Sequence, residues 1–406
     1  MRAAPRRAAG GRRAPTAKVT PAEFKRRAMD LAPAVRERAR EAEELRMLPA
    51  ETIRDLQKAG LFRGLQPARW GGYEIDPATY YEACVELGAA DASTAWVLGV
   101  VGVHNWQLGL FPLEAQQDVW GEDATTLVSS SYAPVGDVRR VEGGFSVRGM
   151  WSFSSGIDYA EWVLTGAVVD SQDTPSRKEG RTLLIPKADY RVVDNWHVAG
   201  LAGSGSKAFV VEDAVVPEYR TLLTRSARKL ETPGSAVNPN PLYHLPFMNV
   251  FVYAVSAPII GVAQGMLDFY LQQAERRLRG APGPLAEDAF AHQRLARASA
   301  GIQAARRQLR ADLDELLGMA IAGKPIPLEA RARFRWGAAY CVDVSMQAID
   351  QLFDVAGGFS IHLDNPLQRM FRDAHAMRAH VQNNVERAAE SYGRALLGLP
   401  DRGSLL

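Results

Sequence analysis

Two histidines, His104 and His380, are the residues of this chain best suited to proton transfer. An imidazole titrates near neutral pH and can donate or accept a proton under the conditions in which enzymes work. His104 stands in an apolar stretch beside Asn105, and two adjacent polar groups on a buried helix both need partners. On pattern alone, a satisfied core histidine is the commoner explanation. His375 lies five residues before His380, about 140° away on a regular helix, so the two cannot both line one small pocket.

Clusters of hydroxyl side chains form a second group of candidates. Three serines, Ser129–Ser131, precede Tyr132 and a proline turn, and they can serve local backbone groups or a ligand. Further on, aromatic and hydroxyl residues alternate, and the period of a strand places Trp151, Phe153 and Ser155 on one face. An apolar wall ending in a hydroxyl suits a flat isoalloxazine ring, which offers its N5 for a hydrogen bond. A half-buried strand with two core aromatics gives the same pattern.

Length and composition indicate a soluble globular protein of two or three domains. The 406 residues are 47% hydrophobic and 23% charged, which is ordinary for this class. The net charge is +2, but residues 1–18 hold six cations and no acid, so the remainder carries 2 − 6 = −4. An acidic body with a short basic tail does not indicate a nucleic-acid partner. The tail, residues 1–18, lacks the apolar core of a secretory signal and is expected to be disordered.

The sequence gives no sign of a metal, a membrane span or a nicotinamide cofactor. The only cysteines, Cys84 and Cys341, lie far apart in apolar surroundings, which suits a reducing cytoplasm better than a disulfide. No CxxC or HxxxH spacing suggests a metal site. No apolar run approaches the roughly 20 residues that a membrane span needs. No GxGxxG motif follows a strand pattern, so a Rossmann site is not expected.

The order of periodic segments predicts an α+β protein with three domains. Residues 19–123 show helical spacing, with helices expected from Pro21 to about Leu48, near Ala50–Ala59, after Asp76 and after Asp91 or Ser93. Residues 124–230 hold short β-branched and aromatic runs, typical of a compact antiparallel sheet or barrel: 125–131, 144–155, 162–169, 182–185 and 208–211. Residues 231–406 predict a four-helix bundle, with helices near 247–279, 286–322, 327–356 and 365–389.

Taken together and in this order, these features resemble the two-component flavin-dependent aromatic monooxygenases of the acyl-CoA dehydrogenase superfamily. Members of that family include the oxygenases that hydroxylate a secosteroid phenol and p-hydroxyphenylacetate. The resemblance covers nearly the whole chain after the tail. It is carried by a series of short matched stretches: Leu65–Pro67, Trp70–Gly72, Val101–Trp106, Trp120–Asp123, Ser129–Pro134, Ser154–Gly156, Gly200–Leu201, Gly203–Ser206, Arg372–His375 and His380.

The same resemblance locates a missing group. In the common dehydrogenases of the superfamily, a carboxylate nine positions after the Arg of an Arg-Asp-Ala start removes a proton from the acyl substrate. Here the motif begins at Arg372 and the corresponding position is Val381, whose side chain cannot accept a proton. His380 stands just before it. The resemblance therefore implies a changed chemistry on the dehydrogenase scaffold.

Roles for individual residues follow from the resemblance alone. It implies that His104 and Ser130, with Asn105 beside them, contact the substrate hydroxyl, that Ser155 bonds flavin N5 and that His380 supports the oxygenated flavin. The remaining residues expected around the cofactor are Ser129, Ser131, Trp151, Phe153, Ser154, Ser204 and Ser206. The implied reaction uses reduced FMN or FAD and O2, through a flavin C4a-hydroperoxide, to hydroxylate a phenol ortho to its hydroxyl. A separate NAD(P)H:flavin reductase would supply the reduced flavin.

Two other activities on the same scaffold stay open. An acyl-CoA dehydrogenase would need its carboxylate elsewhere, and the helix from Leu245 to Arg279 offers only Asp268 and Glu275. A flavin-dependent N- or S-oxygenase needs no base for a phenol, which leaves the pairing of His104 with Ser130 unexplained. The apolar positions of the third bundle helix exceed what one seam needs and predict a homotetramer, or at least a dimer: Ala338, Ala339, Val342, Val344, Met346, Ile349, Leu352 and Phe353.

Overall fold

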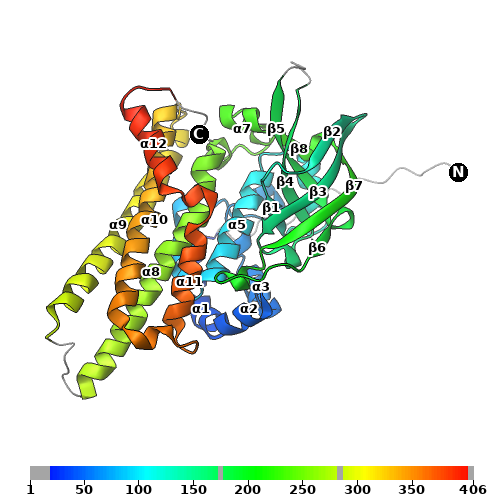
Figure 1. Cartoon of the computed structure of the whole chain (residues 1–406). Helices are drawn as coiled ribbons and strands as arrows, with labels where there is room; N and C mark the ends of the chain where they lie inside the picture. Colours follow the sequence, from blue (N-terminus) through cyan, green and yellow to red (C-terminus); the bar gives the residue numbers. More distant parts are fainter. Residues whose placement is uncertain (1–18, 172–176, 281–286, 401–406) are drawn as a thin grey trace.

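The computed structural model describes residues 19–171, 177–280 and 287–400, so the expected basic tail, residues 1–18, lies outside the described residues. Helices come first, a β domain follows, and a helical bundle ends the chain (Figure 1). This is the α+β architecture expected from the sequence. The amino-terminal helices are α1 (Pro21–Glu37), α2 (Ala39–Leu45), α3 (Ala50–Lys58), α4 (Pro77–Gly88), α5 (Ala92–Leu108) and α6 (Leu113–Trp120).

Local capping residues define the ends of these helices. Asp76 accepts a hydrogen bond from the Thr79 amide at the start of α4, and Asp91 does the same for Thr94 at the start of α5. A carboxylate at this position satisfies amides that have no partner within the helix. Gly60, which follows α3, has a φ of +72°, a conformation that suits glycine. The predicted helix from Pro21 to Leu48 is divided in two, with Arg38 between α1 and α2.

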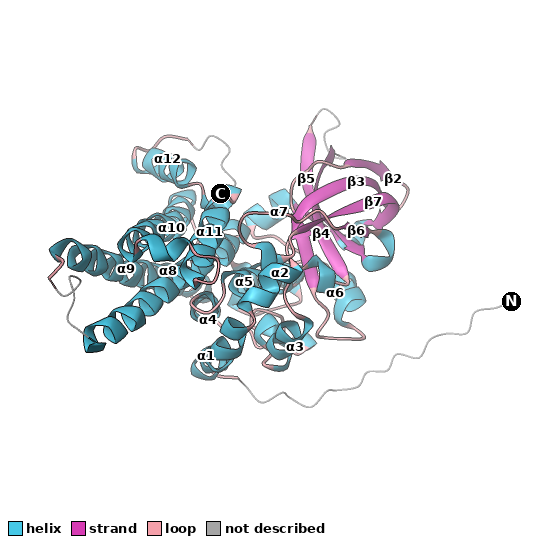
Figure 2. Cartoon of the chain, turned by 60° about the horizontal axis from the view of Figure 1, so that its bottom comes forward, coloured by secondary structure: helices cyan, strands magenta, loops and turns pink. Residues whose placement is uncertain are grey.

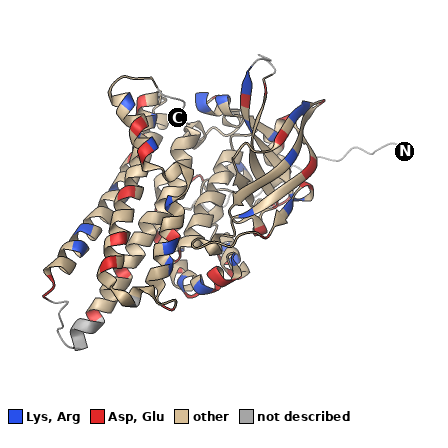
Figure 3. Ribbon diagram, in the orientation of Figure 1, with Lys and Arg blue, Asp and Glu red and all other residues tan. Residues whose placement is uncertain are grey.

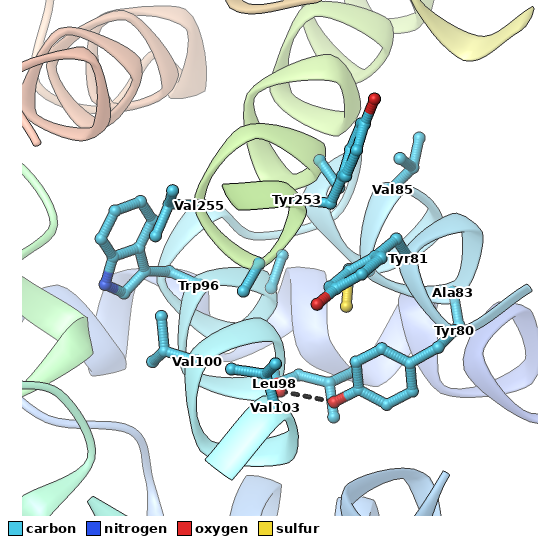
Figure 4. Close-up of a cluster of buried hydrophobic side chains, with 14 of the residues drawn as sticks. Tyr80, Tyr81, Ala83, Val85, Trp96, Leu98, Val100, Val103, Tyr253 and Val255 are labelled. Carbon is cyan, nitrogen blue, oxygen red and sulfur yellow. Dashed lines mark hydrogen bonds between the residues drawn. The ribbon is translucent and has the colours of Figure 1, made fainter. Parts of the chain in front are cut away.

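The core lies where α4 and α5 meet the long helix α8 (Phe247–Gly280). All residues of α5 are buried, as its composition of Ala, Val, Leu, Gly and Trp predicts. Figure 4 shows side chains of α4, α5 and α8 packed against one another, with the Tyr80 hydroxyl donating to the carbonyl of Leu98 at 2.7 Å. At Gly99 a Cβ atom would lie 2.5 Å from the Ala254 carbonyl oxygen, so glycine permits the close approach of α5 to α8.

The β domain consists of two four-stranded sheets that face each other and do not form a closed barrel. One sheet has the order β1-β4-β5-β8 and the other β2-β3-β7-β6. The expected antiparallel pairing holds for the other strand pairs described, whereas β1 and β4 pair in parallel. The strands are β1 (Val128–Ser131), β2 (Asp137–Val141), β3 (Gly144–Ser154), β4 (Trp162–Asp170), β5 (Lys178–Pro186), β6 (Arg191–Val193), β7 (Lys207–Pro217) and β8 (Thr221–Leu223).

The carboxy-terminal helices pack side by side, away from the sheets (Figure 2). After the short α7 (Thr224–Lys229), the chain forms α8, α9 (Ala289–Ile321), α10 (Leu328–Ala356), α11 (Pro366–Arg378) and α12 (Val385–Leu396). The predicted last helix, residues 365–389, is in fact broken. It ends at Arg378 and resumes at Val385, with a short 3-10 turn, η11 (Val381–Asn383), between.

Two expectations about apolar surfaces were wrong. Within α8, Phe247–Glu275 is long and apolar enough to span a membrane, although no such run was expected. Its most apolar window is 94% buried inside the protein, which is the position of a core helix. On α10, the apolar residues expected to face a second subunit are mostly core residues of this chain: Ala338, Ala339, Val342, Met346, Ile349 and Leu352 are buried. They therefore carry no argument for an oligomer.

Candidate active site

His104 connects the buried helix α5 to the first strand of the β domain. Its Nδ1 lies 2.7 Å from the carbonyl oxygen of Val128, and its Nε2 lies 2.8 Å from the hydroxyl of Ser130. A carbonyl only accepts, so Nδ1 carries the proton and Nε2 accepts from Ser130. Sequence analysis named both residues for one role, and the structure brings them into direct contact.

Burial keeps the His104 ring neutral. It lowers the pKa of His104 to about 4, against the opposing effect of the hydrogen bond to Val128. A ring with this pKa is a weak base and cannot take a proton outright from a phenol, whose pKa is about 10. It can hold the Ser130 hydroxyl proton in a hydrogen bond. Ser130 is half-buried and its oxygen keeps lone pairs with which to accept from another hydroxyl.

A second set of hydroxyls forms a continuous chain ending at Ser155. The Ser204 hydroxyl donates to the carbonyl of Leu201 at 2.7 Å, so it must accept from Ser206, which lies 2.7 Å away. Ser206 has then used its proton, and Ser155, also at 2.7 Å, must donate to it. The indole nitrogen of Trp96 donates to Ser155 at 3.0 Å. One lone pair therefore remains on the Ser155 oxygen, which can accept a single further hydrogen bond.

Asp373 binds the loop at Leu201, whose carbonyl anchors the chain of hydroxyl groups. Its carboxylate accepts from the amide of Leu201 at 2.7 Å, and both groups are buried. Burial raises the pKa of Asp373 to about 7, with the charge of Asp91 adding to the effect. Together with Arg372, which pairs with Glu43 on α2 at 2.6 Å, this residue joins α11 to the amino-terminal helices and to the β domain. The Arg-Asp-Ala sequence therefore connects α11 to both preceding domains.

His380 lies outside any α-helix. It precedes η11, and its Nδ1 accepts from the amide of Gln382 at 3.2 Å. The proton of the neutral ring is therefore on Nε2, which has no hydrogen-bond partner among the described residues. Burial lowers the pKa of His380 to about 4, and the charge of Arg335 lowers it further. The ring lies edge-on to Trp96, with centroids 5.6 Å apart. His380 thus presents a neutral donor close to the indole that binds Ser155.

His375 is directed elsewhere. Its Nε2 lies 3.0 Å from a carboxylate oxygen of Asp350, and the side chain is exposed. The expectation that the two histidines do not share a pocket was based on a continuous helix. That basis was wrong, because α11 ends at Arg378.

Two aromatic residues expected around a cofactor, Trp151 and Phe153, lie on β3 in very different surroundings. Trp151 is fully buried between the two sheets and stacks on Phe209. Phe153 is 72% exposed and has a φ of +65°, at an irregularity in the pairing of β3 with β7. The expectation that Trp151, Phe153 and Ser155 share a face was therefore wrong, because the irregularity breaks the period of two.

The hydroxyls of β1 and β3 other than Ser130 and Ser155 bond to each other and to the backbone. Ser129 lies 2.7 Å from the hydroxyl of Ser154 and donates to the carbonyl of Ser155, and Ser131 donates to the carbonyl of Ser152. These contacts join β1 to β3. Ser129 and Ser154 have no exposed surface.

Asn105 also has a structural partner. Its side-chain amide donates to the carbonyl of Phe62 at 2.8 Å, whereas His104 beside it contacts β1. Adjacent residues of a helix point about 100° apart. The structure therefore does not bring Asn105 to Ser130, where the sequence analysis expected a shared substrate contact.

Residues not named from the sequence complete the site. Trp96 joins Ser155 to His380, and Tyr132 lies edge-on to His104 with ring centroids 6.1 Å apart. The Tyr132 hydroxyl donates to Gln107. Tyr132 also contacts the rings of Phe247 and Phe251 at the start of α8. A buried tryptophan or tyrosine needs a partner for its polar atom, which is the signal that could have drawn attention to them.

Tyr132, Phe247 and Phe251 form the floor of a cavity of about 630 Å³ between the β domain, α7 and the first turns of α8. Gln107, Tyr132, Phe247 and Phe251 line its inner part, and β5, α7 and Arg331 line its outer part. The Phe251 ring lies 6.5 Å from that of His380. A ring-shaped ligand on this floor would therefore lie near both histidines.

Comparison with known proteins agrees with this geometry. The acyl-CoA dehydrogenase N-terminal domain matches residues 23–126, and the acyl-CoA dehydrogenase C-terminal domain matches residues 253–385. The oxygenase subunit HsaA of a flavin-dependent monooxygenase from Rhodococcus jostii is 42% identical over 377 residues, covering 91% of this chain and 97% of that protein. The chain belongs to the flavin-dependent monooxygenases of the acyl-CoA dehydrogenase family.

Two further relatives of this monooxygenase extend the comparison. The oxygenase component of an FADH2-dependent resorcinol hydroxylase from Rhizobium sp. is 35% identical, covering 91% of this chain and 92% of that protein. The crystal structure of the 3-HSA hydroxylase from Rhodococcus sp. RHA1 superposes with a TM-score of 0.91 at 41% identity, covering 95% of this chain and 99% of the other. The monooxygenase therefore shares fold and length with its relatives.

The residues of the site fit a reduced flavin. A reduced ring carries a proton on N5, and the remaining lone pair of Ser155 would accept it if the ring lay against this hydroxyl. An oxidised ring in the same position has an acceptor at N5 and would have to take the Ser155 proton away from Ser206. In that position the buried hydroxyl chain would favour the reduced form.

Proposed function

We propose that this monooxygenase is the oxygenase component of a two-component system that hydroxylates a phenol, ortho to its hydroxyl group. It would use O2 and reduced FMN or FAD supplied by a separate NAD(P)H:flavin reductase. Its relatives are oxygenase subunits and components, which supports a separate reductase. The single observation that carries the proposal is the hydrogen bond between His104 and Ser130, beside Tyr132, whose ring contacts His104 and lines the aromatic cavity.

Each side chain has a chemical task in this proposal. The flavin, when bound, supplies the activated oxygen. Ser130 accepts a hydrogen bond from the phenol hydroxyl while donating its own to His104, and this polarisation enriches the ring carbon ortho to the oxygen. The Nε2 proton of His380 is donated to the oxygen that is to be transferred. Trp96, Tyr132 and Phe251 exclude water, which would otherwise reach the reacting oxygen.

The neutral state of both histidines supports these tasks. Burial lowers each pKa to about 4, so His104 stays an acceptor and His380 a single donor over the neutral range. A positively charged His380 would offer an acidic proton to the oxygen and promote loss of hydrogen peroxide. A dry site with neutral donors avoids that loss.

Two rival activities have less support. Val381 is 58% exposed, and Asp268 on α8 is exposed and bonded to Gln264, so neither acyl-CoA dehydrogenase position offers a base. An N- or S-oxygenase would have no use for the His104–Ser130 pair.

Binding of flavin and product formation test the proposal. The purified protein should be nearly colourless, bind reduced flavin more tightly than oxidised flavin, and convert a phenol to a catechol when given reduced flavin and O2. Ser155→Ala should weaken binding of reduced flavin by roughly tenfold, the loss of one hydrogen bond, and leave binding of oxidised flavin nearly unchanged. A protein that purifies bright yellow and is bleached by an acyl-CoA would contradict the proposal.

We also propose that the protein is a cytoplasmic homotetramer. Large apolar side chains are exposed on the segments that meet toward the end of the bundle where α8 ends and α11 begins: Leu271, Phe290, Ile361 and Leu363 are 47%, 78%, 68% and 84% exposed. Large exposed apolar residues that lie together mark interfaces more often than chance positions do.

A further inference from the structure

The outer part of the 630 Å³ cavity is strongly cationic. Among the described residues, six cations and one acid line it, which gives 6 − 1 = +5: Arg177, Lys178, Arg181, Arg225, Arg228 and Arg331 against Glu179. The body of the chain outside its tail carries −4. Figure 3 shows Lys and Arg on α7 and on β5, at the mouth of this cavity. The charge at the mouth is therefore opposite to that of the protein body.

Ion pairs within the protein neutralise only some of these cations. Arg181 pairs with Glu179 at 2.8 Å and with Glu218 at 2.6 Å. Lys178 pairs with Asp170 at 2.6 Å, but both side chains are largely exposed and such a pair is weak. Arg177 and Arg228 have no acidic partner among the described residues, whereas arginines elsewhere on the surface are repeatedly paired.

Among these cations, Arg331 is held in place by backbone carbonyls. It is half-buried, and its guanidinium donates only to backbone carbonyls, those of Ile326 at 2.9 Å and Arg228 at 2.7 Å. Burial lowers its pKa from the ordinary value, so the protein bears a cost for holding this charge. These two bonds fix the guanidinium in place beside the cavity. A fixed, half-buried cation without an acidic partner is suited to an anionic ligand.

The inner part of the same cavity has the opposite character. Tyr132, Phe247 and Phe251 pack ring against ring, with centroids 5.3 to 5.8 Å apart. A ligand that fills the cavity must therefore be aromatic at one end and charged at the other.

We infer that the substrate is a phenol bearing an anionic group, with the ring on the aromatic floor and the anion at the cations of α7, β5 and Arg331. This inference deepens the proposed function and rests on it for the identity of the phenol. Two sources have the required chemistry: a carboxylate on the substrate itself, and the phosphates of a carrier arm joined to it through a thioester. The anionic group would determine which phenols bind tightly, whereas the aromatic floor would bind the ring of any phenol in the same way.

Matched pairs of ligands test the inference by equilibrium binding. The full chain with reduced flavin, kept free of oxygen, is titrated in a calorimeter with 3-(4-hydroxyphenyl)propionate and with its neutral amide. A second pair compares 4-hydroxybenzoyl-coenzyme A with the neutral N-acetylcysteamine thioester. Within at least one pair the anion should bind roughly ten- to hundredfold more tightly, the range of a hydrogen bond to a charged group. The pair that shows the difference identifies the source.

Salt and variants separate the cavity from general charge effects. The advantage of the anion should shrink as ionic strength rises. Arg177→Gln with Arg228→Gln, both at exposed positions, should remove most of the advantage and leave the affinity for the neutral partner unchanged. Arg191→Gln, an exposed cation on β6 outside the cavity, should change neither. Arg331→Gln adds the central residue, provided that its thermal unfolding matches that of the parent.

The outcomes distinguish this inference from the proposed function. Equal affinity within both pairs, or no measurable binding of either anion, would overturn the inference. A catechol product from neutral phenols would then still support hydroxylation. Conversely, selective binding of the anions without any hydroxylated product would support the inference about the cavity and contradict the proposed reaction.

Discussion

At the scale of single residues, the proposed function assigns His104 to the substrate and His380 to the flavin. His104 accepts from Ser130, and His380 offers a proton from Nε2, so the two rings are in opposite hydrogen-bonding states although both are neutral. The difference arises from backbone contacts: the Val128 carbonyl fixes one tautomer and the Gln382 amide fixes the other. Neither contact involves another side chain, so mutation elsewhere in the site leaves both tautomers in place.

The His104 pKa leads to a prediction about pH. Since burial lowers it to about 4, hydroxylation should not show an inflection at the ordinary histidine pKa of about 6.5 and should fall only as the pH approaches 4. His104→Ala should reduce the rate of phenol hydroxylation by roughly 10²–10⁴-fold, the usual contribution of a positioned proton acceptor, without weakening the binding of reduced flavin. Single-turnover product yields between pH 5 and 8 measure both effects. An inflection near pH 6.5 that disappears in His104→Ala would contradict the assigned environment.

Some of these residues could be predicted from the sequence and others could not. A histidine beside Asn105 in an apolar helix signals buried polar groups, but not which neighbour each one meets; Asn105 bonds Phe62, outside the site. The pattern around Phe153 assumed an uninterrupted strand, and its positive φ arises from pairing with β7, which is distant in sequence. Trp96 gave a weaker signal still, because its partner Ser155 lies 59 positions away.

At the scale of elements, the site depends on how closely α5 approaches α8. Gly99→Ala would place a methyl group 2.5 Å from the Ala254 carbonyl oxygen, so the helices would have to separate. We expect this change to lower the free energy of unfolding by about 1–3 kcal/mol, as overpacking does. Gly318→Ala on α9 is the matched control, because nothing lies within 4 Å of its added methyl group. There the better helix propensity of alanine should stabilise the protein by up to about 1 kcal/mol. Urea denaturation of both variants measures the difference.

The joint between α11 and the loop at Leu201 gives a second prediction at this scale. The pKa of Asp373 is raised to about 7 in the folded protein, so its protonated form is favoured there. The contribution of this group to the free energy of unfolding is fully present below about pH 4, near the ordinary carboxyl pKa. It is lost as the pH rises through about 7. Asp373→Asn keeps an oxygen for the Leu201 amide but cannot ionise. Relative to the parent, the variant should gain up to about 1.4 kcal/mol for each pH unit between these limits. Denaturation of parent and variant at pH 5 and pH 8 measures the difference between their free energies of unfolding. The same difference at both pH values would disprove the prediction.

The break after Arg378 shows what element-level patterns leave out. Residues 365–389 have continuous helical spacing, yet the chain turns at Ala379 and starts again at Val385. Asn383 accounts for the turn, since its buried amide donates to the carbonyls of Val255 and Met377. A hydrogen bond from a side chain beyond the helix to a carbonyl at the helix end does not change the spacing of apolar residues. Such a break therefore cannot be predicted from that spacing. The turn matters for function because it places His380 against Trp96.

At the scale of the whole molecule, the arrangement of surfaces separates assembly from catalysis. The cationic mouth of the cavity lies between the β domain and α7, whereas the exposed apolar residues lie at the end of the bundle where α8 ends. Figure 1 shows these regions at opposite parts of the molecule. An assembly through the bundle end would therefore leave the cavity open to substrate and to a reductase.

That separation leads to a prediction about oligomeric state. The protein at micromolar concentration should scatter light as a tetramer, or at least as a dimer. Phe290→Asp with Leu363→Asp should lower the mass, because charged groups would be placed at two of the most exposed apolar positions of the bundle end. Val215→Asp, 60% exposed on β7 in the other domain, is the matched control and should leave the mass unchanged. A monomeric parent would refute the assembly, and an unchanged mass for the double variant alone would move the interface to another face of the helices.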